Sequence, residues 1–280
     1  MSRIVIVTGG ASGIGRALSA ALVSRGDTVV VADVNAVAAE AAVSLMVGPG
    51  MARAAALDVT DAQAVLALVT SVHAEFGRLD IMVNNAGIGM GGPAEELSVA
   101  HWDRVIDVNL RGVVNGVVAA YPLMVQQGSG HIVNTASLAG LIPAPGLTPY
   151  AMTKHAVVGL STSLRIEGAA HGVRVSAVCP GFTDTPILDA PMPSDLRPST
   201  LEGRGRELAA RLPGGLYDAD SLALDIIDGI ERNRRLIVAP RFARLLALTN
   251  RWVPALVERQ ARDRFTAMQG TMRSKLPASR

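Results

Sequence analysis

The sequence is poor in cysteine and in aromatic residues: one cysteine and 3% aromatic side chains among 280 residues. A lone Cys179 cannot form a disulfide within the chain, and none of the five histidines has zinc-ligand spacing with it. We therefore expect no structural metal and no internal crosslink. Cys179 precedes Pro180 in an apolar run and is interpreted as a small buried strand residue.

The chain also has little net charge and no long uninterrupted hydrophobic run. A formal net charge of +2 does not favour a nucleic-acid partner. The best apolar stretch, residues 113–125, is broken by Asn115 and Pro122, which argues against a membrane span. The amino terminus enters an apolar run at once, without the features of a secretory signal, so a cytoplasmic location is expected.

What the sequence does have is a series of short β-branched runs separated by longer segments rich in alanine and leucine. This alternation predicts repeated βαβ units, with a parallel sheet buried between two layers of helices and ligands at the carboxyl ends of the strands. The seven predicted strands are residues 4–7, 28–32, 52–57, 81–83, 131–135, 174–178 and 236–238.

The domain organisation predicted from composition is one α/β domain and one appendage. Residues 1–239 are expected to form the domain, and 240–280 a helical extension rich in arginine. Between about 183 and 217, proline and glycine among mixed residues suggest a loop or lid that crosses the ligand site.

A glycine-rich turn follows the first predicted strand. Glycines at 9, 13 and 15 allow a tight turn and a close approach of backbone N–H groups to a pyrophosphate at a helix amino terminus. Thr8, Ser12 and Ile14 belong to the same turn. The Gly-x-x-x-Gly-x-Gly spacing differs from the usual dinucleotide fingerprint, so by itself the turn fits a plain strand-to-helix connection as well as a Rossmann-type site.

An acidic residue, Asp33, ends the second predicted strand about twenty positions after the glycines. There a carboxylate can accept hydrogen bonds from the adenosine ribose and would repel a 2′-phosphate. Asp33 therefore favours NAD over NADP; the alternative is that it merely caps a turn.

Tyr150 and Lys154 lie four residues apart, where Thr148 is expected to cap a helix and Pro149 to occupy its first turn. Both side chains then share one helix face. A phenol has an ordinary pKa of about 10, and a nearby ammonium and a cationic nicotinamide would favour its ionised form. Tyr150 is thus a candidate general acid or base, although the same spacing is common on helices without any catalytic role.

Taken together these motifs resemble the short-chain dehydrogenase/reductase family from residue 3 to about 186, and more loosely from 217 to 239. The resemblance rests on their order and spacing: Thr8-Gly-x-x-x-Gly13-x-Gly15, Asp58, Asn84-Asn85-Ala86-Gly87, Asn109, Ser137, Tyr150-x-x-x-Lys154 and Pro180-Gly181. It implies a Rossmann-like doubly wound fold and an oxidoreductase that uses NAD.

The resemblance also implies roles for individual residues. Ser137 would bind the substrate oxygen, Lys154 would hold the nicotinamide ribose and lower the pKa of Tyr150, and Asn109 would kink its helix and anchor a water of the proton relay. Asp58 and Val59 would meet the adenine, and Asn85, Ala86 and Gly87 would lie beneath the adenosine ribose. The cofactor would also contact Tyr150, Pro180, Gly181, Thr183 and Thr185, with Thr185 receiving the nicotinamide carboxamide.

The function we predict is hydride transfer between NAD and a hydrophobic secondary alcohol or ketone. A 3-oxoacyl-acyl-carrier-protein reductase and a regulator that binds NAD without turnover are the alternatives. The substrate is expected to meet Ser137, Tyr150 and a set of apolar side chains, namely Leu138, Leu141, Ile142, Leu147, Phe182, Ile187, Leu188 and Met192.

Two further expectations concern partners. Helices around 102–125 and 149–170 carry small residues suited to close packing in a homodimer or homotetramer. From Asn233 to Phe265, eight arginines stand against two acids, with apolar residues at roughly helical spacing and Pro254 ending or bending the first helix. These helices are expected to cover the lid or a subunit interface; the alternative is that they lie on an anionic membrane surface.

Overall fold

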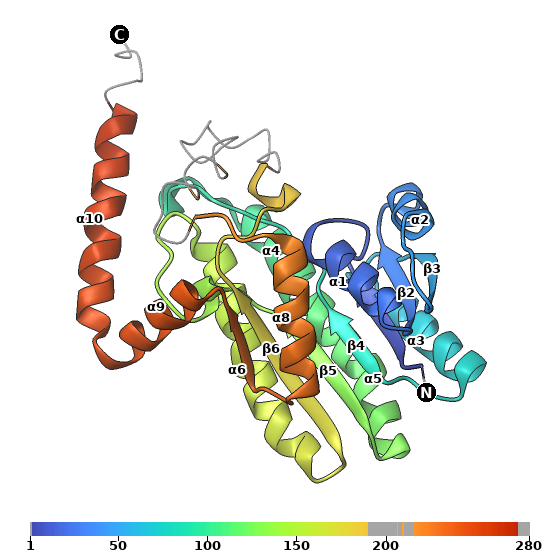
Figure 1. Cartoon of the computed structure of the whole chain (residues 1–280). Coiled ribbons are helices and arrows are strands. Elements are labelled where there is room, and N and C mark those ends of the chain that lie inside the picture. The colour runs from blue at the N-terminus through green and yellow to red at the C-terminus, as the bar shows by residue number, and fades with distance from the viewer. Residues whose placement is uncertain (1, 190–205, 207–208, 210–214, 274–280) are drawn as a thin grey trace.

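The computed structural model of the chain describes residues 2–189, 206, 209 and 215–273. All seven predicted strands are confirmed, and they form one parallel sheet in the order β3-β2-β1-β4-β5-β6-β7 (Figure 1). The order reverses between β1 and β4, which creates a crevice at the carboxyl ends of these strands. The strands are β1 (Ile4–Thr8), β2 (Thr28–Asp33), β3 (Met51–Ala56), β4 (Ile81–Asn84), β5 (Gly130–Thr135), β6 (Val173–Pro180) and β7 (Leu236–Ala239).

Helices cover both faces of the sheet, as expected for a doubly wound fold. The α-helices are α1 (Gly13–Ser24), α2 (Ala36–Ser44), α3 (Ala62–Phe76), α4 (Val99–Ile106), α5 (Gly112–Gln127), α6 (Thr148–Ala169), α8 (Ala219–Glu231), α9 (Arg241–Trp252) and α10 (Pro254–Arg273). Short 3-10 turns span Ala94–Glu96, Leu138–Gly140 and Pro186–Asp189, and a π-helical segment spans Asp107–Arg111.

Alternate residues of β1 contribute to two separate hydrophobic cores. Val5 and Val7 of β1 pack with α1 and α8 on one face, whereas Ile4 and Ile6 pack with α3 and α5 on the other. Because all five residues of β1 are buried, the strand needs apolar side chains on both faces. This requirement explains the near-continuous β-branched runs of the sequence.

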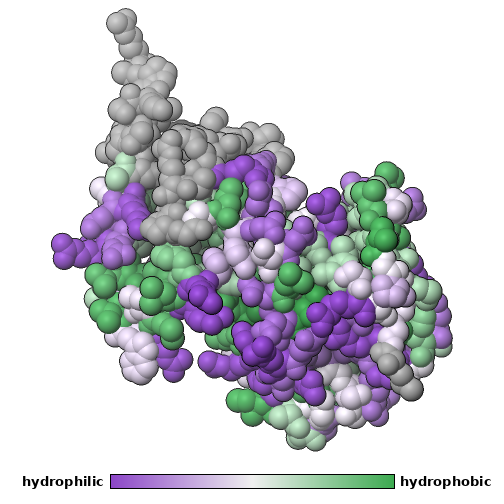
Figure 2. Space-filling view, viewed as in Figure 1, coloured by the Kyte–Doolittle hydropathy of each residue, from purple (hydrophilic) through white to green (hydrophobic). Residues whose placement is uncertain are grey.

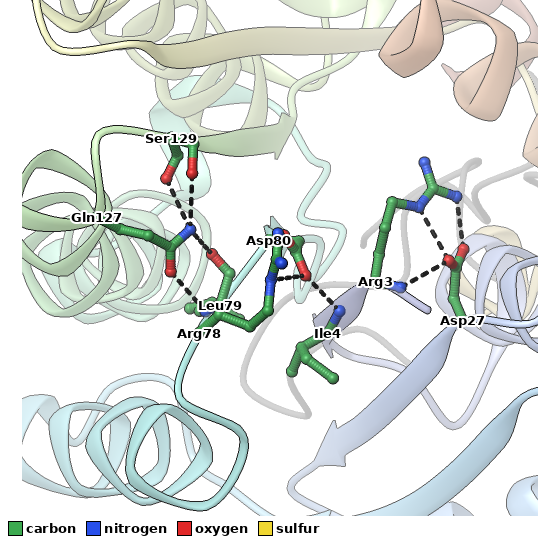
Figure 3. Close-up of polar contacts among 8 residues, drawn as sticks. All are labelled: Arg3, Ile4, Asp27, Arg78, Leu79, Asp80, Gln127 and Ser129. Atoms are coloured by element: carbon green, nitrogen blue, oxygen red, sulfur yellow. Dashed lines mark hydrogen bonds and ion pairs between the residues drawn. The ribbon is translucent and has the colours of Figure 1, made fainter. Parts of the chain in front are cut away.

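A polar layer joins the strands at the edge of the sheet opposite the crevice (Figure 3). Arg3 Nε donates to Asp27 Oδ1 over 2.9 Å, and the Ile4 N–H donates to Asp80 Oδ2 over 2.7 Å. The Gln127 amide accepts from the Leu79 N–H and donates to the backbone of Ser129. These contacts satisfy the amino-terminal edge within the chain, so the carboxyl-terminal edge is the one left for ligands.

The longest apolar helical stretch runs without a break from Val99 to Gln127. Its length and mean hydropathy of 1.3 would suffice to cross a membrane. In the fold its α5 portion packs against α3, β4 and β5, and 39% of the apolar window is buried within the described residues.

Three expectations need adjustment or completion. Thr148 is the first residue of α6 and not its cap: Leu147 occupies the cap position and makes no side-chain capping bond. Pro254 does end the first tail helix, since α9 stops at Trp252 and α10 begins at Pro254. Most of the predicted lid lies outside the described residues, as does Met192.

Candidate active site

The turn between β1 and α1 has glycines at positions that cannot readily take a larger residue. Gly9 and Gly13 have φ of +61° and +49°, a backbone conformation that side chains disfavour. A Cβ on Gly15 would lie 2.1 Å from the Gly9 carbonyl oxygen. The first N–H groups of α1 therefore open onto the crevice beside the exposed Ser12, as a phosphate-binding turn requires.

Asp33 lies at the carboxyl end of β2, next to this turn. Its Oδ2 accepts from the Ala11 N–H over 3.1 Å and its Oδ1 from the Asn35 N–H over 3.0 Å. The carboxylate therefore does cap local backbone, and it also ties β2 to the glycine turn. Each oxygen keeps a further lone pair for a ligand hydroxyl.

Thr8 links the ends of β1 and β4 at the reversal of strand order. Its Oγ1 accepts from the N–H groups of Asn85 and Ala86 over 2.9 and 3.1 Å, and the Asn85 amide donates to the Thr8 carbonyl over 3.0 Å. The side chain of Asn84 takes a different direction, into the core, where it donates to Asn134 Oδ1 over 2.8 Å. The crevice floor is thus formed by residues 85–87.

Tyr150 and Ser137 meet above this floor, from the first turn of α6 and the loop after β5. Burial raises the pKa of Tyr150, and a hydrogen bond to Ser137 opposes that rise. The lowering that the sequence predicts is not found in the chain alone, because desolvation outweighs the stabilising contact. A phenol with a raised pKa stays protonated at neutral pH, and the same rise makes it a weaker acid.

Lys154 lies one turn further along α6 and is almost fully buried, with 3% exposure. Its Nζ donates to the Thr135 carbonyl over 2.9 Å and lies 5.5 Å from the centre of the Tyr150 ring. Burial lowers its pKa to about 8. The neighbouring Cys179 is fully buried, as expected, and burial raises the pKa of its thiol to about 12, which keeps it neutral.

Asn109 sits in the π-helical segment between α4 and α5, where a local change of helical pitch frequently marks a functional site. Its Oδ1 accepts from the Ile88 N–H over 2.8 Å and its Nδ2 donates to the Ile88 carbonyl over 2.9 Å. A Cβ on Gly87 would lie 3.2 Å from Asn109 Oδ1 and 3.4 Å from Lys154 Nζ. Asn109 therefore holds the floor of the crevice close to Lys154.

The remaining predicted cofactor residues lie at the same edge of the sheet. Asp58 is exposed after β3 and accepts from the N–H of Thr60, while Val59 is buried and its carbonyl accepts from Asn115. Beyond β6, Thr183 and Thr185 are each 5% exposed, and a Cβ on Gly13 would lie 3.1 Å from Thr185. The segment after Pro180 and Gly181 therefore reaches the glycine turn.

The predicted substrate-lining residues differ in exposure. Leu138 is buried, Leu141, Ile142 and Leu147 are half-buried, and Phe182 and Ile187 are 39% and 38% exposed. Exposed aromatic and aliphatic side chains in the segment after β6 suit an apolar ligand.

Sequence reasoning missed Thr135 and Thr153, which connect the predicted residues. The Thr135 carbonyl receives Lys154, and its hydroxyl donates to Asn85 Oδ1 over 3.2 Å. The Thr153 hydroxyl donates to the Tyr150 carbonyl over 2.8 Å and accepts from Asn109 over 3.5 Å. A polar residue at the carboxyl end of a buried strand was the available signal for Thr135.

Fold and site together define a doubly wound nucleotide-binding protein with a buried tyrosine and lysine beside its crevice. The family model described as short chain dehydrogenase matches residues 3–194. The chain therefore belongs to the short-chain dehydrogenase family and is an oxidoreductase.

Individual relatives agree with this membership. The chain is 41% identical to cis-4-hydroxycyclohexanecarboxylate dehydrogenase of Sinomonas cyclohexanicum over 76% of this chain and 82% of that protein. It is 36% identical to the 3-oxoacyl-[acyl-carrier-protein] reductase FabG of Thermotoga maritima over 71% and 81%. The crystal structure of a short-chain dehydrogenase/reductase from Burkholderia phymatum in complex with NAD superposes with a TM-score of 0.79 at 31% identity, covering 91% and 95%.

Proposed function

We propose that this enzyme transfers a hydride between NAD and a hydrophobic secondary alcohol or ketone. The observation that carries the proposal is the meeting of Tyr150, Ser137 and Lys154 beside a glycine turn that has no room for side chains. These residues supply a transferable proton, a second hydroxyl for the substrate oxygen and a buried ammonium.

The chain's donors fit a dinucleotide. The N–H groups at the start of α1 suit a pyrophosphate, and Asp33 at the end of β2 suits the hydroxyls of an adenosine ribose. The residues that would hold the dinucleotide are Thr8, Gly9, Ser12, Gly13, Ile14, Gly15, Asp33, Asp58, Val59, Asn85, Ala86, Gly87, Lys154, Pro180, Gly181, Thr183 and Thr185. NAD, when bound, supplies the carbon that gives or takes the hydride.

In ketone reduction, the Tyr150 hydroxyl donates its proton to the substrate oxygen as negative charge develops there. Ser137 donates a second hydrogen bond to that oxygen, which lowers the energy of the developing alkoxide. The Lys154 ammonium then stabilises the phenolate left on Tyr150. In alcohol oxidation the same proton moves back to Tyr150.

Asp33 supports NAD as the cofactor, because its carboxylate would repel the 2′-phosphate of NADP. An acyl-carrier-protein reductase is the second enzymatic candidate, and the choice of cofactor alone does not separate the two, because a 3-ketoacyl-(acyl-carrier-protein) reductase from Brucella melitensis is known in complex with NADH. A regulator that binds NAD without turnover has no need of the Tyr150, Ser137 and Lys154 arrangement.

The decisive experiment compares the parent with Tyr150→Phe in an absorbance assay with NAD and a graded panel of secondary alcohols. The variant loses the transferable proton and little volume, so turnover should fall at least about 100-fold while NAD affinity is kept. Residual activity above about a hundredth of the parent would refute the assigned role of Tyr150. Absence of turnover by the parent with every alcohol and ketone would favour the regulator.

We also propose that the enzyme is a homodimer or homotetramer assembled through α5 and α6. Val118 and Ile166 on these helices are 65% and 78% exposed, and Gly159 has open space where a Cβ would be. Burial of these surfaces against a second copy would remove apolar area from water. Light scattering at micromolar concentration tests this, and a monomer would contradict it.

The outer face of the tail is proposed to contact an anionic membrane surface. Hydrophobic residues gather on the surface over α9 in Figure 2, where Leu245 and Trp252 are 63% and 76% exposed and the exposed Arg241, Arg244 and Arg251 lie among them. An apolar face with a cationic border suits an interface between headgroups and acyl chains. Salt-sensitive sedimentation with phosphatidylserine vesicles, lost in Trp252→Ala, supports this role. A full-length protein that ignores the vesicles would place the face at a subunit interface instead.

A further inference from the structure

Beyond its exposed face, the tail has an inner face that packs onto the loop between Ser137 and Tyr150. Ala243 of α9 is 1% exposed, and Leu246 and Ala247 join a core cluster that also contains Leu138 and Leu141. The matched family region ends at residue 194, so these contacts come from a part of the chain outside it. The tail thus packs directly against the loop that carries the expected substrate-lining residues.

One polar contact fixes this packing. Asn250, in the last turn of α9, donates from Nδ2 to the Leu141 carbonyl over 2.9 Å, across 109 residues of sequence. The loop is tightly held on its other side too, because a Cβ on Gly140 would lie 2.5 Å from the Lys154 carbonyl oxygen. The loop is therefore clamped between the catalytic helix α6 and the tail helix α9.

The next tail helix faces the same loop further along. A groove of about 420 Å³ separates the loop from α10; Pro143, Ala144 and Pro145 line one side, and Glu258, Arg262 and Phe265 the other. Helix α10 itself packs mainly against α9 (Figure 1). The position of α9 therefore determines where the loop lies and how far α10 stands from the loop.

We propose that Asn250 is a positioning residue for substrate binding, and that it acts by fixing the 138–147 loop through the Leu141 carbonyl. The inference rests on the proposed function, because this loop carries the expected substrate-lining residues Leu138, Leu141 and Leu147. Asn250 does not touch the reacting atoms. When its hydrogen bond is lost, the substrate itself must order the loop, so the effect falls on substrate KM.

The test uses Asn250→Leu and Asn250→Asp in the full-length enzyme. Leucine has a similar size and removes both the donor and the buried Oδ1, which lacks a hydrogen-bond partner among the described residues. Aspartate keeps the shape and, when ionised, has no donor for Leu141. The matched control is Thr249→Val, since the Thr249 hydroxyl donates only within α9, to the Leu245 carbonyl over 3.0 Å.

Two measurements are made on each variant. Hydrogen exchange follows the amides of Gly140, Leu141 and Ile142, which donate to carbonyls within the loop. Steady-state kinetics give KM for the best alcohol and for NAD. Both Asn250 variants should exchange these amides about fivefold faster and raise the alcohol KM about fivefold, the size of one net hydrogen bond, with kcat and the NAD KM within about twofold of the parent.

Three results would overturn the proposal: exchange and alcohol KM unchanged in both Asn250 variants, faster exchange without a change in alcohol KM, or equal changes in Thr249→Val. If the parent turns over no alcohol or ketone, the proposed function has failed and the substrate role of Asn250 with it. The exchange data then still decide whether Asn250 holds the loop, so the two failures are distinguishable.

Discussion

Replacing Lys154 with methionine should abolish turnover and yet remove a source of instability from the fold. Burial lowers the pKa of Lys154 from 10.5 to about 8, so the folded state binds its proton less tightly than the unfolded state does. At pH 7 this difference destabilises the parent by about 3 kcal/mol. The lost hydrogen bond to the Thr135 carbonyl has the opposite effect on the variant, at about 1–3 kcal/mol for an unsatisfied buried group.

The pH dependence separates the two effects. A base with a depressed folded pKa carries its full penalty below pH 8 and loses it as the pH rises towards 10.5, because the unfolded state then no longer binds a proton that the folded state lacks. From pH 7 to pH 9.5 the parent should therefore gain about 2 kcal/mol relative to Lys154→Met. The missing hydrogen bond contributes nearly equally at both pH values and cancels from this difference.

The assay is urea unfolding of both proteins at pH 7 and pH 9.5. Met152→Leu, a change at an exposed position of the same helix, serves as the control and should follow the parent at both pH values. A stability difference between parent and Lys154→Met that stays constant with pH, or that moves in favour of the variant, would refute a buried lysine with a lowered pKa.

Three other predictions follow from the site and the core. Asp33→Ala should raise kcat/KM with NADP, since a repulsive carboxylate is removed. The measurement is the ratio of kcat/KM with NADP to kcat/KM with NAD. An unchanged ratio would show that Asp33 does not select the cofactor. Gly15→Ala should abolish NAD binding in a fluorescence titration, because its Cβ would fall 2.1 Å from the Gly9 carbonyl oxygen; unchanged affinity would contradict the close-packed turn. Burial and nearby arginines lower the pKa of His131 to about 3, so the parent should lose stability as the pH falls below 6.5, by about 2 kcal/mol between pH 7 and pH 5. His131→Asn should lose less over that interval in urea unfolding, and an identical loss in both proteins would exclude His131 as the cause.

The sheet could be predicted from the sequence because buried parallel strands are encoded locally. A strand covered on both faces needs a continuous apolar run, and each of the seven runs predicted to be strands is one. The start of α6 was misplaced by one residue, because Thr148 has the side chain of a cap while the turn geometry gives that position to Leu147.

The site could be predicted only as far as its motifs extend. Tyr150, Lys154 and Ser137 have the spacing of the short-chain dehydrogenase motifs. The residues that contact them and fix their positions belong to no such motif. Nothing near Leu141 in the sequence indicates that its carbonyl will be bound by Asn250, 109 residues away. Contacts of this kind arise from the folded arrangement of α9, and a local pattern carries no information about them.

The bridge between Thr183 and Tyr217 has a consequence for how such an enzyme can change over evolutionary time. The Asp184 N–H donates to the Tyr217 carbonyl and the Tyr217 N–H to the Phe182 carbonyl, both over 2.8 Å, so the two ends of the intervening segment are fastened together at its base. Doubling the length of a closed loop destabilises a fold by only about 0.6 kcal/mol. A change in the length of the sequence between 189 and 215 would therefore leave the sheet, α6 and the buried Thr185 in their places, which makes this stretch of sequence a natural place for recombination and for engineering new substrate preferences.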